Sequence, residues 1–223
     1  MFEKAIITID GPSGVGKSTA ARSVAEKLGL SYLDTGAMYR AIALQAMRER
    51  VNIDVTKELG SLLDRTEITF RRDRSHTLLV LVNNEDITDK IRTPEISRLS
   101  SDIATKGIVR TRLIEIQRRV GKEGGIVAEG RDMGTYVFPD AKYKFYLDAE
   151  LEMRAKRRWN QLHESGSDAN IEDISKQIAA RDKQDMERSE SPLHPARNAV
   201  IINTTHLNAD EVVLKIIKEV QDS

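Results

Sequence analysis

Residues 5–19 read AIITIDGPSGVGKST, and this stretch decides the fold class. Its first five residues form a short run rich in β-branched side chains, which is typical of a buried strand. The glycine-rich loop, residues 11–19, follows, and apolar residues then recur at helical spacing as far as Leu28. A strand, a tight loop and a helix in this order form the unit from which parallel α/β sheets are built.

The glycine-rich loop matches the pattern G-x-x-x-x-G-K-[ST], which is typical of a site for nucleotide phosphates. Its glycines let successive backbone N–H groups turn toward phosphate oxygens, and the helix that follows adds its positive end. We expect Lys17 to reach the β- and γ-phosphates of ATP and the Ser18 hydroxyl to ligate Mg²⁺. A chance Lys-Ser after a glycine-rich turn is the structural alternative, but the position between a strand and a helix argues against it. The residues expected to bind ATP are Gly11, Pro12, Ser13, Gly14, Val15, Gly16, Lys17, Ser18 and Thr19.

Four further short apolar runs predict additional strands of the same sheet. They lie at residues 31–33, 125–128, 144–147 and 199–202. Residues 66–88 differ, because two apolar runs there are joined by turn-forming residues and predict a small antiparallel insert. We therefore expect an α/β fold with a five-stranded parallel sheet and helices on both faces.

The length suits one α/β domain with insertions, so we expect residues 1–223 to form a single domain. Within it, residues 60–95 are expected to form the antiparallel insert. Charged helices are expected at about 150–163 and 171–189, and residues 150–170 are expected to act as a helical lid.

The composition excludes several classes of protein. Lysine plus arginine and aspartate plus glutamate both number 35, so there is no basic excess for non-specific nucleic-acid binding. The absence of cysteine excludes disulfides, thiolate nucleophiles and cysteine-ligated zinc. Residues 1–4 lead into no long apolar segment of a secretory signal, and no run reaches the ~18 apolar residues of a membrane span. We therefore expect a cytoplasmic protein with neither a membrane nor a nucleic-acid partner.

The helix expected at 171–189 changes character along one face. Three isoleucines at its start form an apolar stripe, and Arg181, Asp185 and Arg188 fall near the same line at about 100° per residue. A solvated Arg181–Asp185 ion pair is the structural alternative. Continuity with the apolar stripe favours a polar cleft, because buried charges need partners.

Arginines of the preceding helix leave two interpretations open. Arg158 lies on the apolar face of that helix, Arg154 lies at its edge, and Arg157 points away. The long side chains can extend over apolar surface, or they can close on transferring phosphates as part of a mobile flap.

Two polar segments follow strands of the predicted sheet. Arg131 and Asp132 directly follow one strand. Thr35, Tyr39 and Arg40 follow another. Ligands of α/β sheets bind at the carboxyl ends of the strands, so this position favours binding over core packing or solvated side chains.

Taken together, these motifs resemble those of bacterial cytidylate kinases, and the resemblance runs nearly from end to end. The shared segments are GPSGVGKST at 11–19, LDTGAMYR at 33–40, EGRDMGT at 129–135, and Arg181–Asp182 with Asp185 and Arg188. Many kinases share the first segment, whereas the second and third in this order and spacing are much more specific. The antiparallel insert is also similar to the extra acceptor-side lobe of this family.

The resemblance implies a P-loop kinase that uses Mg²⁺ to transfer the γ-phosphoryl group of ATP to CMP or dCMP. We expect the protein to act on these small molecules as a monomer. It implies that Arg40, Arg131 and Arg188 hold the acceptor phosphate. It also implies that Asp185, oriented by Arg181, holds the sugar hydroxyls. The residues implied to bind the acceptor are Thr35, Tyr39, Arg40, Ser101, Arg110, Arg131, Asp132, Arg181, Asp185 and Arg188. Those implied to be catalytic are Lys17, Arg131, Arg158 and Arg188, with Ser18 as the metal ligand.

Base reading is implied for Ser101, Arg110 and Asp132. The role of Asp132 has a physical basis, because cytosine presents an amino group that a carboxylate accepts, whereas uracil places a carbonyl there. A small register error on the helix at 109–120 would exchange Arg110 and Arg112.

Rival functions remain open at the level of the sequence. One is a kinase of the same fold that acts on another monophosphate or on a sugar-like acid. Another is a nucleotide-regulated binding module that hydrolyses ATP slowly. A GTPase is disfavoured because no Asn-Lys-x-Asp motif is present.

Overall fold

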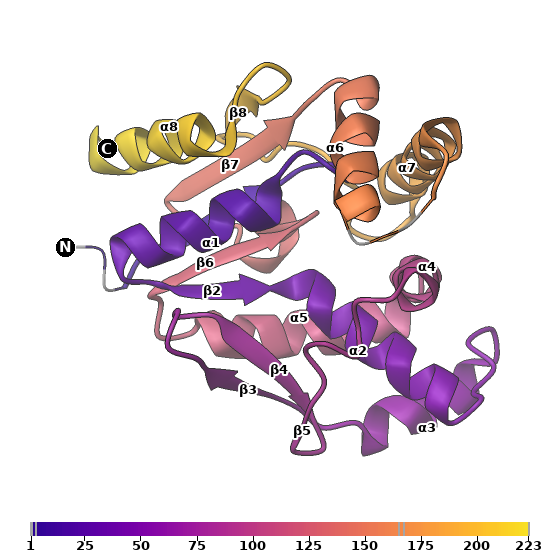
Figure 1. Ribbon diagram of the computed structural model, residues 1–223. Coiled ribbons are helices and arrows are strands. Elements are labelled where there is room, and N and C mark those ends of the chain that lie inside the picture. The colour runs from indigo at the N-terminus through magenta and orange to yellow at the C-terminus, as the bar shows by residue number, and fades with distance from the viewer. Residues whose placement is uncertain (1, 3, 165, 167, 223) are drawn as a thin grey trace.

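A parallel sheet of five strands runs through the molecule in the computed structural model, which describes residues 2, 4–164, 166 and 168–222 (Figure 1). Its strands are β1 (Ile6–Asp10), β2 (Ser31–Asp34), β6 (Ile126–Gly130), β7 (Tyr143–Asp148) and β8 (Val200–Asn203). They lie in the order β2-β6-β1-β7-β8, and all neighbouring pairs are parallel. The α/β fold and the five-stranded parallel sheet expected from the sequence are therefore confirmed.

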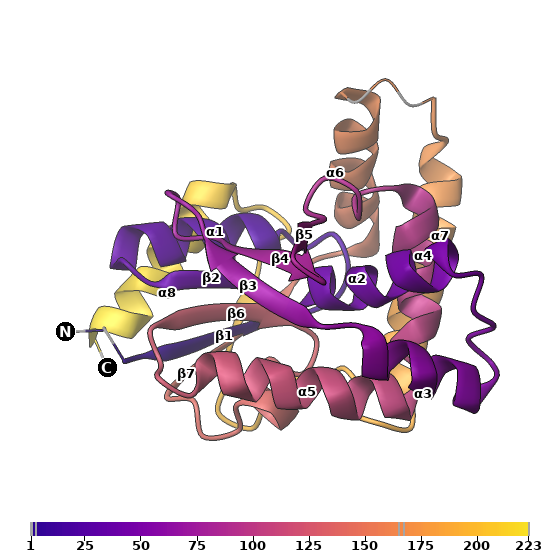
Figure 2. The ribbon, with the colours of Figure 1, turned by 90° about the horizontal axis from the view of Figure 1, so that it is seen from below.

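Helices cover both faces of this sheet. α1 (Lys17–Leu28) and α8 (Ala209–Asp222) lie on one face, and α5 (Gly107–Gly121) lies on the other (Figure 2). Strands covered on both faces read as short continuous apolar runs, which is why they are recognisable in the sequence. The remaining helices are α2 (Thr35–Arg48), α3 (Thr56–Arg65), α4 (Pro94–Ile103), α6 (Leu151–Glu164), α7 (Ile171–Glu187) and the short π-helix η1 (Met133–Val137).

Side chains that satisfy free backbone groups set the start of several helices, among them α4 and α8. Thr93 caps α4, because its Oγ1 accepts a hydrogen bond from Ile96 N at 3.2 Å, and Pro94 occupies the first helical position. At α8, Asn208 N donates to Glu211 Oε2 at 2.8 Å, and Glu211 N donates to Asn208 Oδ1 at 3.0 Å. This reciprocal pair is a capping box, and it fixes where the last helix begins.

Helix α3 occupies residues to which the sequence assigns no element. Leu59, Leu62 and Leu63 recur at helical spacing, and all three are buried in the core that also contains α2. Polar residues fill most of this ten-residue helix, so the apolar signal is short. Packing of the three leucines decides the structure of this segment.

The antiparallel insert expected near residues 66–88 is confirmed as a three-stranded sheet. Its strands are β3 (Ile68–Arg72), β4 (Leu78–Val82) and β5 (Glu85–Asp86). The turn at 73–77 lies against the edge strand β2, where Tyr32 N donates to His76 O at 2.9 Å and Tyr32 pairs with Thr77. The insert is therefore attached to the outer edge of the main sheet.

The limits expected from the sequence for the single domain (1–223), the insert (60–95) and the lid (150–170) remain predictions. Positions 165 and 167 of the expected lid lie outside the described residues. Positions 1 and 3 of the amino-terminal stretch also lie outside them.

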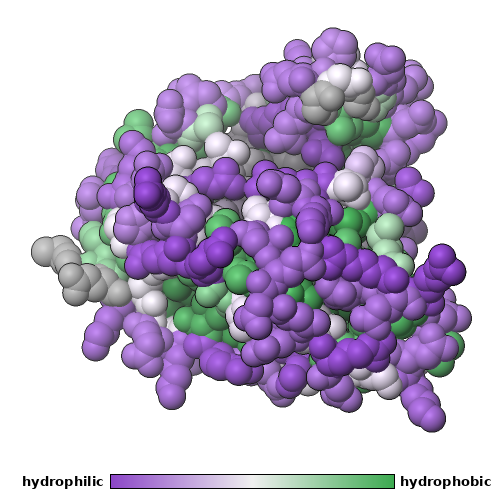
Figure 3. Space-filling model, turned by 60° about the horizontal axis from the view of Figure 1, so that its bottom comes forward, coloured by the Kyte–Doolittle hydropathy of each residue, from purple (hydrophilic) through white to green (hydrophobic). Residues whose placement is uncertain are grey.

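The surface is mostly polar on the face drawn in Figure 3, where hydrophobic side chains show only in smaller areas between hydrophilic ones. Exposed apolar side chains such as Ile201 on β8 and Leu214 on α8 occur on the surface, as is normal for a globular protein. Within the described ranges, no helix combines the length and apolar character needed to cross a membrane.

Candidate functional site

Two adjoining cavities open where the strands of the main sheet end. The large cavity has a volume of about 1280 Å³, and the small cavity has a volume of about 210 Å³. Both are lined by Ser13, Gly14, Lys17, Ser18, Arg40, Ser101 and Arg181. The glycine-rich loop therefore lies where the cavities meet, so that a ligand in one can approach a ligand in the other.

Backbone geometry shapes the glycine-rich loop. Gly11 has a φ of 146°, and a Cβ atom there would lie 2.1 Å from Leu147 O, so a side chain does not fit. Gly16 adopts the left-handed conformation with a φ of 95° immediately before α1. The first turn of α1 lines the large cavity, and the positive end of this helix suits an anion there.

Lys17 is the charged side chain of this loop. Its Nζ donates to Pro12 O at 2.6 Å, and the side chain is buried. Burial, reinforced by the nearby charge of Arg131, lowers the pKa of Lys17 to about 7. An anion beside Nζ would stabilise the charged form, so the position suits a phosphate group.

Glu129 is hydrogen-bonded to the same loop, although no role for it is expected from the sequence. Its Oε1 accepts from Ser18 Oγ at 2.5 Å and from Tyr32 OH at 2.9 Å. A hydroxyl and a carboxylate are oxygen ligands of the kind that Mg²⁺ prefers. The described chain holds no group of three or more histidine, cysteine or acidic side chains suited to a metal, so Mg²⁺ would need phosphate and water ligands as well.

The signal for Glu129 in the sequence is its position near the carboxyl end of a strand. β6 pairs with both β1 and β2, and Glu129 lies opposite Ile9 of β1 and Asp34 of β2. A carboxylate between these two strands lies close to the loop that follows β1. The sequence shows the strand, but the order of the strands is needed to see this proximity.

Buried ion pairs line the small cavity. Asp132 is hydrogen-bonded to Arg110, and Arg188 Nη2 lies 3.8 Å from Asp132 Oδ1. Asp185 accepts from Arg131 Nε at 2.8 Å and lies 3.5 Å from Arg188 Nη1. Burial raises the pKa of Asp132 despite its arginine partners. At Asp185 burial also acts to raise the pKa, but the charges of Arg131, Arg181 and Arg188 together with the hydrogen bond from Arg131 outweigh it, and the pKa is lowered. Cations and carboxylates thus alternate along the wall of this cavity.

The structure distinguishes Arg110 from Arg112. Arg110 is 1% exposed and lies with its guanidinium 5.8 Å from the centre of the Tyr39 ring. Arg112 is exposed on the same helix, 3.9 Å from Glu115. Arg110 is therefore the residue of this pair that reaches the small cavity.

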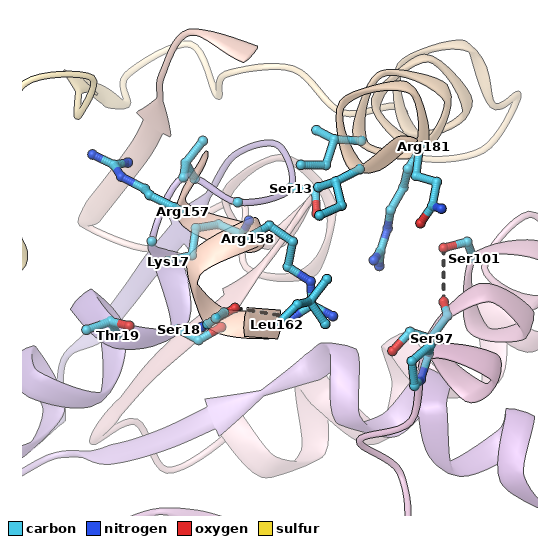
Figure 4. Close-up of a pocket in the computed structure, with 18 of the residues that line it drawn as sticks. Ser13, Lys17, Ser18, Thr19, Ser97, Ser101, Arg157, Arg158, Leu162 and Arg181 are labelled. Atoms are coloured by element: carbon cyan, nitrogen blue, oxygen red, sulfur yellow. Dashed lines mark hydrogen bonds between the residues drawn. The ribbon is translucent and has the colours of Figure 1, made fainter. Parts of the chain in front are cut away.

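Arg181 makes no ion pair or hydrogen bond with Asp185 among the contacts of the described residues, although its charge helps to lower the pKa of that carboxyl group. Asp185 contacts Arg131 and Arg188 instead, and the buried Nε of Arg181 has no hydrogen-bond partner among the described residues. Burial lowers the pKa of Arg181 to about 10. Figure 4 shows its side chain extending from α7 into the large cavity. Helical spacing permits the Arg181–Asp185 pair, but Arg131 from the segment after β6 takes the carboxylate.

Arg154 of α6 is buried, and its guanidinium group is held by several polar contacts. It is paired with Asp182 of α7 and donates to Ser13 O at 3.1 Å. Asp182 Oδ1 in turn accepts from Ser13 N at 3.0 Å. These contacts join α6 and α7 to the backbone of the glycine-rich loop.

The other two arginines of α6 line the large cavity. Arg157, which helical periodicity predicts to point away, donates to Thr204 Oγ1 at 3.0 Å and to Leu207 O at 3.2 Å. Arg157 thus lies off the apolar face of α6, which packs against α7, but it still lines the large cavity because the segment after β8 supplies these acceptors. Arg158 bonds only to the exposed Gln161, at 3.2 Å, among the hydrogen bonds found for it in the described chain.

Most residues expected from the sequence come together in this cleft. Thr35, Tyr39, Arg40 and Ser101 all line the small cavity, and Thr35 Oγ1 donates to Glu129 O at 2.7 Å. Residues Ser13, Gly14, Val15, Gly16, Lys17, Ser18 and Thr19 of the loop line the large cavity. Gly11 and Pro12 support the loop from behind and are not among the lining residues of either cavity.

Comparison with known proteins agrees with this arrangement. The family model described as cytidylate kinase matches residues 7–222. A cytidylate kinase of Desulfitobacterium hafniense is 44% identical over 97% of this chain and 92% of its own length. A cytidylate kinase of Syntrophotalea carbinolica is 44% identical over 100% of this chain and 94% of its own length. Among solved structures, an uncharacterized protein from Eubacterium ventriosum is similar in fold, with a TM-score of 0.54, 16% identity and 99% of each chain covered.

Proposed function

The chain belongs to the cytidylate kinase family and transfers a phosphoryl group from ATP to CMP. We propose that it also accepts dCMP, and that both transfers are in-line. The observation that carries this proposal is the buried Asp132–Arg110 pair beside the glycine-rich loop. A carboxylate next to N–H donors complements cytosine, whose amino group donates while its neighbouring ring nitrogen and carbonyl accept. Both acceptors carry this base, so the pair suits CMP and dCMP alike.

The donor phosphates are proposed to bind along the glycine-rich loop. Lys17 is well suited to the β- and γ-phosphates, because a phosphate would stabilise its buried ammonium. Mg²⁺ is proposed to be held by Ser18 Oγ beside Glu129, where it neutralises phosphate charge.

The acceptor is proposed to bind in the small cavity. Arg40, Arg131 and Arg188 would hold its phosphate, since guanidinium groups match phosphate oxygens in geometry and charge. Asp185 would accept from the sugar hydroxyls. Ser101 and Arg110 would read the base together with Asp132, and Thr35, Tyr39 and Arg181 would complete the wall.

Catalysis on this proposal consists of positioning and electrostatic stabilisation. Lys17, Arg131 and Arg188 would neutralise the charge that develops on the transferred group. Arg158 would join them when α6 and α7 close over the cleft as a lid. Closure would exclude water, so that the phosphoryl group passes to CMP and ATP is not hydrolysed.

We further propose that the protein acts in the cytoplasm as a monomer, with small molecules as its partners. The balanced charge of 35 basic and 35 acidic side chains and the absence of cysteine support this setting.

The test is a kinase assay with ATP, Mg²⁺ and four separate acceptors: CMP, UMP, AMP and shikimate. CMP is expected to give the highest rate of ADP formation, with dCMP added as a fifth acceptor to test the extension. A higher rate with AMP or shikimate would identify a different kinase. ADP formation that is independent of any acceptor would indicate a nucleotide-regulated binding module instead.

A further inference from the structure

Asp34 makes two hydrogen bonds at the point where β2 becomes α2. Its Oδ1 accepts from Ala37 N at 2.9 Å and so caps the helix. Its Oδ2 accepts from Arg40 Nη2 at 2.8 Å. The carboxylate of Asp34 therefore has two roles. It caps the start of α2, and it holds the guanidinium group of Arg40, which lies about one and a half turns further along that helix.

Gly36 leaves room for that arginine. A Cβ atom at this position would lie 2.9 Å from Arg40 Nη1 and 3.2 Å from Asp34 Oδ1. The guanidinium thus lies across the bare backbone of Gly36. Since Gly36 is inside α2 and its φ is not in the left-handed region, the space for Arg40 is the reason for a glycine here.

The Arg40 side chain remains open to the cleft. It is 23% exposed and lines both the large and the small cavity. Asp34 accepts from one of its five N–H groups, so the others stay available to a ligand. An ion pair exposed to this degree contributes little to folding stability, which leaves orientation of Arg40 as its main effect.

We propose that Asp34 is a positioning residue that, with Gly36 beneath, holds Arg40 ready for the acceptor phosphate. This inference rests on the proposed role of Arg40 in the phosphorylation of CMP. An arginine that is already ordered loses less conformational freedom when the phosphate arrives, so binding is tighter. The benefit is specific to the acceptor, because the donor phosphates contact the glycine-rich loop.

The test uses Asp34→Asn, because asparagine caps a helix about as well as aspartate but lacks the charge that holds Arg40. The KM for CMP is expected to rise about three- to tenfold, while kcat and the KM for ATP stay within about twofold of their original values. Gly36→Ala is expected to act in the same direction, since its methyl group displaces Arg40. An unchanged or lowered KM for CMP in Asp34→Asn would overturn the inference.

A double-mutant cycle separates positioning from a merely structural role. Arg40→Ala is expected to raise the KM for CMP, and adding Asp34→Asn to it is expected to change nothing further. Independent effects of the two substitutions would overturn the inference, because Asp34 would then not act through Arg40. Glu85→Gln is the matched control, since it removes a different α2 ion pair, with Arg48, from outside the cleft.

The same assay distinguishes failure of this inference from failure of the proposed function. If the unmodified protein does not phosphorylate CMP, the proposed function itself fails, and the inference fails with it. If it phosphorylates CMP and Arg40→Ala raises the KM, but Asp34→Asn does not, the inference alone fails.

Discussion

The donor end and the acceptor end of the cleft are built in different ways. At the donor end, nine consecutive residues of one loop shape the site through backbone geometry and a single lysine. At the acceptor end, the side chains come from α2, α4, α5, α7 and the segment after β6, and they hold one another through buried ion pairs. The comparison shows that a short continuous segment of the sequence can form a phosphate site. The residues that recognise a second substrate come from many parts of the chain.

The two ends also differ in how their charges are balanced. Lys17 makes no ion pair within 4 Å with an acidic side chain of the described chain, whereas Arg110, Arg131 and Arg188 each lie against a carboxylate. A buried ion pair offsets much of its own desolvation, and removing one partner leaves the other uncompensated. Substitutions at the two ends should therefore differ in what they do to catalysis and to stability.

The largest effect is expected at the donor end. Lys17→Ala should lower kcat about 10²- to 10³-fold with both CMP and dCMP, because it removes a charge that stabilises the transferred phosphoryl group. Steady-state kinetics measure this loss, and thermal unfolding checks that the fold is retained. Lys27→Ala, on the exposed side of the same helix, is the control and should leave kcat unchanged. A loss of activity that merely parallels a loss of folding would contradict the assignment.

The next effect should separate the two substrates. Arg188→Ala is expected to raise the KM for CMP about 10- to 100-fold while changing the KM for ATP much less, because the lost contacts are to a charged acceptor phosphate. Arg112→Ala, which removes an exposed arginine near Glu115, should have no effect on either KM. Equal rises in both KM values would remove the distinction between the donor and acceptor ends.

A smaller effect should appear within the acceptor itself. Asp185→Ala is expected to lower kcat/KM for CMP about tenfold more than for dCMP, because only CMP has a 2′-hydroxyl that can donate to this carboxylate. Parallel measurements with both acceptors give the ratio directly. An identical loss for the two substrates would show that Asp185 does not contact the 2′-hydroxyl, and its bond to Arg131 would then be its main role.

The smallest effect concerns pH and the unpaired lysine. Because the pKa of Lys17 is lowered to about 7 in the folded protein, the unfolded chain binds more protons between pH 7 and pH 10. The free energy of unfolding without ATP should therefore rise with pH through this window and level off below pH 7, where the folded and unfolded chains both hold the proton. Urea unfolding of the unmodified protein and of Lys17→Met at pH 7 and pH 9 should differ in their pH response by about 2 kcal/mol. An identical response in the two proteins would contradict the lowered pKa.

The sequence predicts the donor end well because its signals are local. The strand, the loop and the helix of residues 5–28 are contiguous, and each part has its own pattern. The five parallel strands and the antiparallel insert follow from equally local runs of apolar residues. Helix α3 shows the limit, since its three leucines give too short an apolar signal.

The contacts of the acceptor end could not be predicted in the same way. Helical periodicity brings Arg181 and Asp185 to one face, but it cannot show that Arg131 arrives from 54 residues away to take the carboxylate. The contact of Glu129 with Ser18 cannot be predicted for the same reason, because it depends on which strands are neighbours. Residue types in a cleft are readable from the sequence, whereas their partners depend on tertiary structure.

The attachment of the insert to β2 has a consequence for how copies of this protein behave when they are crowded together. An edge strand of a sheet presents free N–H and C=O groups, which is how aggregation between chains begins. On one side of the sheet, the turn at 73–77 occupies part of that edge through the bond from Tyr32 N to His76 O. On the other side, β8 offers a strand of only four residues. By occupying these backbone groups, the insert reduces the length of free edge at which another copy of the protein could pair with the sheet.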